Sequence, residues 1–262
     1  MATHDSAPTE VGNAAGTLFQ ATALAISISR FCIVRFSLKL NPFVQEHLMA
    51  TYHPSNHALA TPDRPAYIMA DSGKSVSFGQ LDRQANQFSH VFRSLGLQRG
   101  AGIAMLMENA PGFLEVCWAS QRSGLHFTPI STHLKAPEIG YIIADCGAQA
   151  LLVSSRYADA AQSLAELLGD DTILLSIGGD IPGYQPLETL ADKQPEAPIA
   201  DRAPGVTMLY SSGTTGYPKG VRRSLAETPF DDIPLRLGSI AERYGFDESS
   251  VYLCPAPLYH AA

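Results

Sequence analysis

The sequence has few charged residues and no excess of basic ones. Its 262 residues include 18 lysines and arginines against 25 aspartates and glutamates, which gives a net charge of -7. A protein that binds nucleic acid over a broad surface needs a basic excess to neutralise phosphates, so we expect no nucleic-acid partner. Charged residues make up 16% and hydrophobic residues 45%, which excludes a mostly disordered chain and indicates a soluble globular protein.

Cysteine is scarce, and its spacing excludes the common metal and redox motifs. No two cysteines form a C-x-x-C pair; the four are Cys32, Cys117, Cys146 and Cys254. Free thiols are typical of a reducing compartment, so we expect a cytoplasmic location. His53 and His57 lie four residues apart and would share a helix face, but no Glu follows His53 as the zinc-protease pattern requires. We therefore predict no metal site there, only surface or capping histidines.

The chain also has no hydrophobic run long enough to span a bilayer. The mildly apolar stretch "LFQATALAISIS" (residues 18–29) is shorter than the roughly 20 residues required, and the basic residues follow it, unlike in a signal peptide. We expect residues 1–48 to be a poorly ordered extension, since termini are usually loose unless tied down. The alternative is an amphipathic helix that makes peripheral membrane contact. Domain-like patterning begins at Met49, an alternative start site, and continues over residues 49–262.

From Pro65 onward, strand-like and helix-like segments alternate. The capping-box pattern "SFGQ" at Ser77 begins a helix that stops at Gly96. Short uncharged runs predict strands at 102–107, 125–130, 148–154 and 172–177, and helical patterns lie between them, beginning at Pro111, Ala136 and Arg156. This alternation predicts an α/β fold of mainly parallel sheets flanked by helices.

The amino-acid composition changes between residues 178 and 204. Five prolines accompany five acidic residues in this segment, which predicts an acidic, proline-rich surface connection that could contain a short helix. A further strand is expected at residues 205–210, "GVTMLY".

A glycine-rich loop follows that strand. Its small residues leave backbone N–H groups unblocked, its hydroxyls add donors, and one lysine adds a positive charge, a set suited to a polyphosphate: Ser211, Ser212, Gly213, Thr214, Thr215, Gly216 and Lys219. The P-loop pattern G-x-x-x-x-G-K-[ST] does not fit, because Tyr217 and Pro218 separate the last glycine from the lysine. Composition alone leaves two interpretations open, a phosphate-binding loop and a flexible linker.

The stretch "MLYSSGTTGYPK" (residues 208–219) resembles the signature loop of the adenylate-forming superfamily, which includes acyl-CoA synthetases, luciferases and peptide synthetase adenylation domains. A second segment, "VYLCPAPLYHAA" (residues 251–262), resembles the family stretch that ends in an aromatic residue and a histidine. The similarity covers residues 52–262 and is strongest to the fatty-acyl-CoA synthetase branch. Ala101 departs from the family, which commonly has Asp at this structural position.

The resemblance implies activation of a carboxylic acid. In this family the substrate carboxylate attacks ATP, with Mg²⁺ present, to form acyl-AMP and pyrophosphate, and the thiol of CoA then displaces AMP. Carried over, the resemblance assigns contact with the ATP phosphates to residues 211–216 and to Lys219. Tyr259 and His260 are candidates to line the acyl and adenylate site, and no residue is assigned with certainty to catalysis or to a metal. A fatty acid is the favoured substrate.

The family's adenine, magnesium and ribose segments and its C-terminal domain would follow Ala262. The resemblance therefore predicts the incomplete N-terminal domain of an acyl-CoA synthetase-like fold, without its C-terminal part. We expect such a chain to be inactive alone, poorly soluble or dependent on a complementing C-terminal half. Whether it is an enzyme stays open: the alternative is a non-catalytic nucleotide-binding or interaction module, or the product of a decayed gene.

Overall fold

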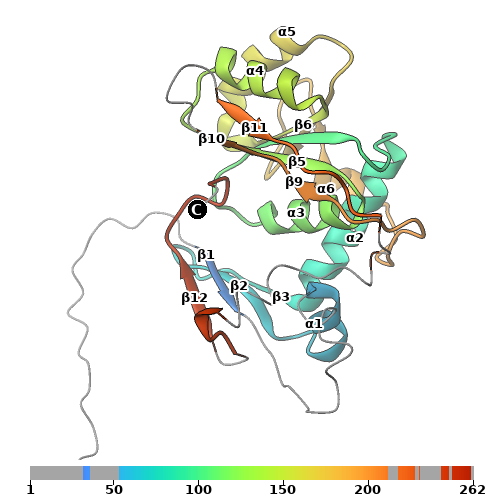
Figure 1. Ribbon diagram of the computed structural model, residues 1–262, viewed down its shortest axis with the longest axis vertical. Helices are drawn as coiled ribbons and strands as arrows, with labels where there is room; N and C mark the ends of the chain where they lie inside the picture. Colours follow the sequence, from blue (N-terminus) through green and yellow to red (C-terminus); the bar gives the residue numbers. More distant parts are fainter. Residues whose placement is uncertain are drawn as a thin grey trace, which may run out of the picture.

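The computed structural model describes residues 53–211, 218–227, 230, 243–247 and 250–260, and the backbone of one strand at 32–35. It contains a parallel sheet covered by helices on both faces and a smaller antiparallel sheet below it (Figure 1). No helix in the described part of the chain is long and apolar enough to cross a membrane.

The parallel sheet has six strands in the order β8-β7-β6-β4-β5-β9, and every pairing in it is parallel. The strands are β4 (Gly102–Leu106), β5 (His126–Ile130), β6 (Ala148–Ser154), β7 (Ile173–Ile177), β8 (Gln185–Pro186) and β9 (Val206–Thr207). β4 and β5 are buried at every residue, as expected for strands covered on both faces. The α/β fold class and the four strands predicted between residues 102 and 177 are confirmed.

The helices form one layer on each face of this sheet (Figure 1). On one side lie α2 (Phe78–Ser94) and α3 (Phe113–Arg122), and on the other lie α4 (Ala136–Cys146) and α5 (Ala158–Leu168), which the 3-10 turn η2 (Ser155–Tyr157) precedes. Alternate residues of β4 divide between the two layers: Ile103 and Met105 belong to the α2–α3 core, and Ala104 and Leu106 to the α4–α5 core. The period-2 geometry of a strand produces this division.

The start and stop signals of α2 act as the sequence predicts. The Ser77 hydroxyl accepts a bond from the Gln80 N–H at 3.3 Å, and the Gln80 side chain accepts one from the Ser77 N–H at 2.9 Å. The helix ends before Gly96, whose φ of 86° favours glycine. α3 begins two residues later than Pro111, after Gly112 at φ 96°.

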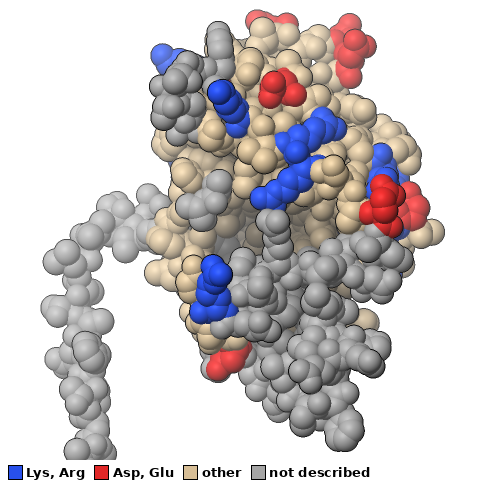
Figure 2. Space-filling model, in the orientation of Figure 1, with Lys and Arg blue, Asp and Glu red and all other residues tan. Residues whose placement is uncertain are grey.

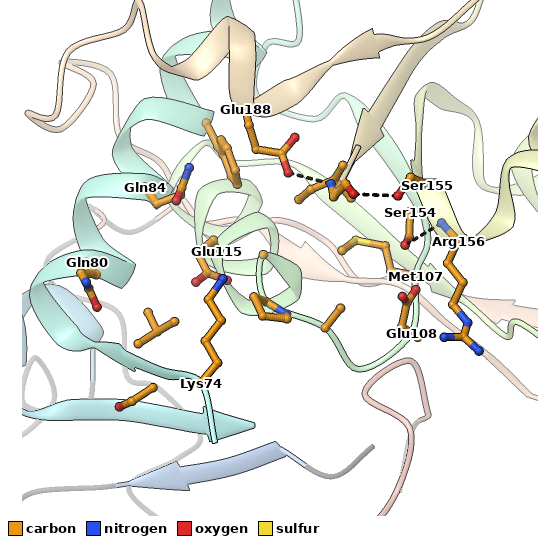
Figure 3. A pocket seen from close by; sticks show the side chains of 18 residues that line it. Lys74, Gln80, Gln84, Met107, Glu108, Glu115, Ser154, Ser155, Arg156 and Glu188 are labelled. Atoms are coloured by element: carbon orange, nitrogen blue, oxygen red, sulfur yellow. Dashed lines mark hydrogen bonds between the residues drawn. The ribbon is translucent and has the colours of Figure 1, made fainter. Parts of the chain in front are cut away.

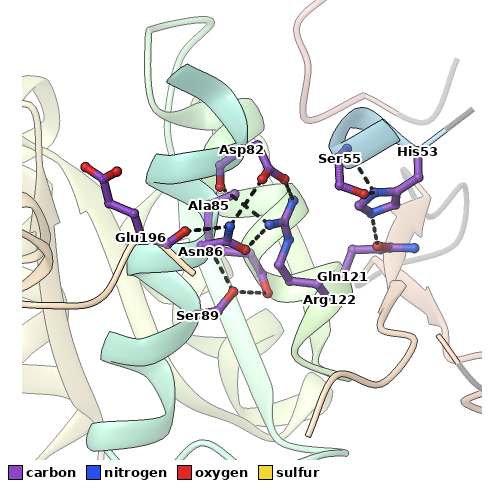
Figure 4. Close-up of polar contacts among 10 residues, drawn as sticks. His53, Ser55, Asp82, Ala85, Asn86, Ser89, Gln121, Arg122 and Glu196 are labelled. Atoms are coloured by element: carbon purple, nitrogen blue, oxygen red, sulfur yellow. Dashed lines mark hydrogen bonds and ion pairs between the residues drawn. The ribbon is translucent and has the colours of Figure 1, made fainter. Parts of the chain in front are cut away.

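A buried polar cluster joins α2 to α3 (Figure 4). Arg122 on α3 is only 2% exposed, and its guanidinium donates to Asp82 Oδ1 at 2.9 Å and to the Asn86 side chain, both on α2. Asn86 also donates to the Glu196 carbonyl oxygen at 2.8 Å. The cluster thus ties two helices to the segment that crosses α2.

The antiparallel sheet has the order β12-β1-β2-β3. Its strands are β12 (Val251–Cys254), β1 (Cys32–Arg35), β2 (Pro65–Met69) and β3 (Ser75–Ser77). β1 belongs to the stretch expected to be a poorly ordered extension, and the remainder of residues 1–48 lies outside the described residues.

His53 is the N-cap of the short helix α1 (Pro54–Ala60), so the expectation of a capping histidine is confirmed, although it does not share a helix face with His57. Its Nδ1 accepts from the Ser55 N–H at 3.2 Å, its ring meets Trp118 of α3 edge-on, and it is 7% exposed. Burial and the nearby Arg122 charge lower the pKa of His53 to about 3.

Two segments differ from the sequence-based expectation. Residues 178–204 are not only a surface connection, because they contribute β8 to the sheet and helix α6 (Leu187–Ala191), and they bury Ile181, Tyr184 and Leu187 between the prolines. The strand expected at residues 205–210 is interrupted at Met208: β9 stays beside β5, whereas β10 (Leu209–Ser211) pairs with β11 (Lys219–Val221).

Candidate functional site

The glycine-rich loop is held between the two strands of the β10–β11 hairpin. Tyr210 pairs with Gly220 and Ser211 with Lys219 across the antiparallel ladder, and the Ser211 hydroxyl donates to the Lys219 carbonyl oxygen at 3.4 Å. The remaining predicted phosphate contacts, Ser212, Gly213, Thr214, Thr215 and Gly216, lie outside the described residues. The ladder therefore fixes the two ends of the loop next to one another.

A hydrogen bond from Tyr210 anchors this hairpin to the end of α4. The Tyr210 hydroxyl donates to Asp145 Oδ2 at 2.5 Å, and burial together with the Asp145 carboxylate raises the pKa of Tyr210, so the phenol stays a donor. Arg222, just after β11, donates to the Cys146 carbonyl oxygen at 3.3 Å. Two bonds thus hold the hairpin on the last turn of α4.

Gly220 makes the Tyr210 position possible. A Cβ atom placed on Gly220 would lie 2.6 Å from Cζ of the Tyr210 ring and 2.5 Å from the Met208 methyl carbon. The glycine therefore leaves the space through which Tyr210 crosses β11 to reach α4.

A pocket of about 410 Å³ lies beside the hairpin, at the carboxyl end of β5, and we call it the loop pocket. It is lined by Pro129, Ile130, Ser131, Leu134, Ile142, Tyr210, Ser211, Pro218, Tyr259 and His260. Three residues predicted from two distant motifs, Ser211, Tyr259 and His260, thus meet around one cavity. Lys219 does not line it; its side chain is exposed on β11.

The residues before Tyr259 are positioned by Asn109, which sequence reasoning missed. This side chain follows β4 and is 7% exposed; it donates to the Ala256 carbonyl oxygen at 3.1 Å and accepts from the Leu258 N–H at 2.7 Å. The second motif is therefore fastened to the carboxyl end of the parallel sheet. A polar residue shortly after a buried strand is the signal in the sequence that could have indicated it.

The charged groups around the hairpin suit an anionic ligand. Figure 2 shows basic side chains spaced over the face that carries the β10–β11 hairpin, with one acidic group among them and the other acidic groups towards the edges. Among the described residues, no three His, Cys, Asp or Glu side chains are grouped as a metal site would require. The described lining of the loop pocket therefore offers hydroxyl and imidazole groups next to an apolar wall, and the Lys219 ammonium group lies outside it on β11.

The sequence profile of the AMP-binding enzyme family matches residues 55–262. The chain belongs to this family. Among curated relatives of this family member, the fatty acid–[acyl-carrier-protein] ligase ScoC of Streptomyces coeruleorubidus is 27% identical over 71% of the chain and 37% of the relative. The long-chain-fatty-acid–CoA ligase FadD13 of Mycobacterium tuberculosis is 27% identical over 78% of the chain and 40% of the relative. The chain thus spans about two fifths of the length of these relatives.

Solved structures agree with this membership. The N-terminal domain of FACL13 from Mycobacterium tuberculosis aligns with a TM-score of 0.54 and 26% identity, over 65% of this chain and 42% of that one. The anthranilate CoA ligase AuaEII, solved with anthranoyl-AMP, gives a TM-score of 0.53 and 28% identity, over 57% of this chain and 30% of that one. The fold is therefore that of the N-terminal region of acyl-CoA synthetases.

Proposed function

We propose that this AMP-binding chain provides the phosphate-binding loop and part of the acyl wall of a ligase that activates a fatty acid. The observation that carries the proposal is the meeting of the two ends of the loop, Ser211 and Pro218, with Tyr259 and His260 around the loop pocket. The sequence profile and the CoA-ligase relatives support ATP and CoA as substrates.

The reaction is the two-step activation of a carboxylate. A carboxylate oxygen attacks the α-phosphorus of ATP, the bond to the β-phosphate bridging oxygen breaks, and pyrophosphate leaves with its charge. A thiolate then attacks the acyl carbon and AMP leaves. Catalysis of the first step consists mainly of positioning and charge stabilisation.

In this chain the loop between Ser211 and Pro218 would hold the departing phosphates, with hydroxyl and backbone N–H donors and with Lys219 as the nearby cation. Magnesium would enter with the ATP phosphates and share their charge; the described residues supply no carboxylate cluster for it.

The lining of the loop pocket supports a hydrocarbon substrate. Ile130, Leu134 and Ile142 form an apolar side, and Tyr259 and His260 form a polar one. An acyl chain on the apolar side would place its carboxylate towards the imidazole and the loop. We therefore propose a fatty acid as the acid, in line with the substrates that the names of ScoC and FadD13 give for those proteins.

Calorimetric titration of the chain with pyrophosphate and with MgATP tests the phosphate-binding role. We expect binding that weakens as salt is added, and at least ten-fold weaker binding in a Thr214→Ala/Lys219→Ala variant, because even one charge-assisted bond contributes about 1.5–3 kcal/mol. Lys193→Ala is the matched control, since it removes an equally exposed lysine from the distant segment after α6. Equal affinities in all three proteins would contradict the proposal.

A further inference from the structure

A second pocket, of about 680 Å³, lies at the carboxyl ends of β4, β6 and β7 (Figure 3). β4 and β6 are neighbours in the sheet, yet the chain leaves them in opposite directions, from β4 to β5 on one side and from β6 to β7 on the other. Such a switch point in an open α/β sheet opens a crevice at the strand ends, where ligands commonly bind. We call this cavity the switch pocket; the residues lining it do not overlap with those of the loop pocket.

The wall of the switch pocket contains a buried carboxyl group with a free oxygen. Glu115, in the first turn of α3, is 3% exposed; its Oε1 accepts from the Tyr67 hydroxyl at 2.6 Å, but its Oε2 has no hydrogen-bond partner among the described residues. Figure 3 shows its carboxyl group directed into the cavity. Burial raises the pKa of the Glu115 carboxyl group, because the charged form is poorly solvated there. A bound cation would favour the ionised form and supply the missing donor, whose absence costs about 1–3 kcal/mol.

Two further glutamates line the switch pocket. Glu108 lies two residues after the end of β4, and its Oε2 is also buried without a partner in the described structure. Glu188 lies on the opposite wall, where its Oε1 accepts from the Gly178 N–H at 2.7 Å. These three carboxyl groups are not grouped as metal ligands, since the described residues contain no such group of three. The ligand that suits them is therefore larger than a single ion.

The cations of the switch pocket are exposed, unlike its carboxyl groups. Lys74 and Arg156 line the cavity, and both side chains are exposed. Among the described residues, neither forms an ion pair with a glutamate of the switch pocket. In Figure 3 Lys74 extends towards Glu115, so its ammonium group would compete with a bound cation for this carboxyl group. The rest of the lining includes Phe88, Met107 and Ile177, which can cover a short hydrocarbon chain.

We propose that the switch pocket binds a small organic cation, whose alkylammonium or guanidinium group donates to Glu115 Oε2 and whose carbon chain packs on Phe88, Met107 and Ile177. The cavity volume lies within the roughly 300–1,000 Å³ that small-molecule sites occupy. The proposal is independent of the phosphate-binding role of the loop pocket.

Titration of the full chain with hexylammonium, with uncharged 1-hexanol as the comparison ligand, tests this site by NMR or calorimetry. We expect hexylammonium to bind in preference to hexanol, with about ten-fold weaker binding or more in Glu115→Gln, because a charged hydrogen bond is lost. Lys74→Gln should bind more tightly than the unmodified chain, since it removes the competing ammonium. Glu166→Gln, an exposed change on α5, is the matched control and should bind as the unmodified chain does.

Thermal melting of each variant separates loss of the ligand site from loss of the fold, and Glu108→Gln supplies a second variant of the same wall should Glu115→Gln fail to fold. Equal binding of hexanol, or undiminished binding in whichever of these two variants folds, would overturn the proposal. Binding confined to Lys74→Gln would also overturn it, because Lys74 would then be the resident cation of the pocket.

Discussion

The loop pocket and the switch pocket lie along the same carboxyl edge of the parallel sheet but are built in different ways. The loop pocket combines two short contiguous motifs, residues 208–219 and 251–262, on an apolar wall. The switch pocket draws its lining from short separate segments spread between Lys74 and Glu188, none of which was recognised as a binding motif. A site for phosphates can thus be recognised in a sequence from its local chemistry, whereas a site of dispersed carboxyl groups becomes visible only after folding.

Replacement of Arg122 should have the largest effect, because it joins α2 to α3 in the layer that covers one face of the parallel sheet. Arg122→Met leaves the Asp82 carboxylate without its buried partner, and breaking such a pair costs about 3–5 kcal/mol of unfolding free energy. Urea denaturation measures this change. Arg83→Met, which breaks a 3.8 Å pair with Glu196 on the surface, is the control and should cost less than about 1 kcal/mol. Similar losses in both variants would show that the cluster does not support the shared layer.

Low pH should reduce the free energy of unfolding through His53, which packs against α3, a helix that lines the switch pocket. The unfolded imidazole binds a proton near pH 6.5, but the folded one stays neutral down to about pH 3, so the unfolded state holds the extra proton in between. Stability is therefore complete above pH 6.5 and falls by up to about 1.4 kcal/mol for each pH unit below it.

His53→Asn keeps a side chain that can cap α1 and removes this titration. The difference in unfolding free energy between the unmodified chain and this variant should narrow or reverse from pH 7 to pH 5. A difference that stays constant over that range would contradict the buried neutral imidazole.

Substitution of Gly220 should separate the two pockets. In Gly220→Ala the new methyl group collides with the Tyr210 ring, and overpacking of this kind costs about 1–3 kcal/mol. We expect pyrophosphate affinity to fall about ten-fold and hexylammonium affinity to stay unchanged. Gly73→Ala is the control: its φ of 68° disfavours alanine, but no atom lies within 4 Å of the added carbon. An equal loss of pyrophosphate affinity in Gly220→Ala and Gly73→Ala would contradict the role assigned to the β10–β11 hairpin.

The smallest effect is expected for the bond between Tyr210 and Asp145. Tyr210→Phe removes the donor and should weaken pyrophosphate binding about three- to five-fold, in keeping with about 1 kcal/mol for an accessible hydrogen bond. Asp145→Asn retains an acceptor oxygen and should have a smaller effect. Fluorescence titration of both variants with pyrophosphate measures these affinities. A larger loss of affinity in Asp145→Asn than in Tyr210→Phe would contradict the anchoring role of the bond.

Local signals predicted much of the fold. The capping box at Ser77 and the uncharged run at residues 148–154 gave elements whose limits match α2 and β6, because both depend on neighbouring residues. The interruption at Met208 was not predictable, since it follows from the separate partners of β9 and β10. The burial of part of residues 178–204 was not predictable either, because the apolar residues of this segment are interspersed with prolines and acidic residues in the sequence.

The candidate site divides in the same way. Tyr259 and His260 were found from a motif, and the structure places them beside Ser211. Asn109, Asp145 and Glu115 were missed, because each acts on a residue at least 48 positions away in the chain. Only the topology of the sheet brings such residues together.

A crossed titration tests the central claim, that the loop pocket holds phosphates independently of the switch pocket, most directly. Pyrophosphate and hexylammonium are each titrated into the unmodified chain, Thr214→Ala/Lys219→Ala and Glu115→Gln. The account predicts that the first variant loses affinity only for pyrophosphate and the second only for hexylammonium. Undiminished pyrophosphate binding in Thr214→Ala/Lys219→Ala, with the fold intact, would contradict it.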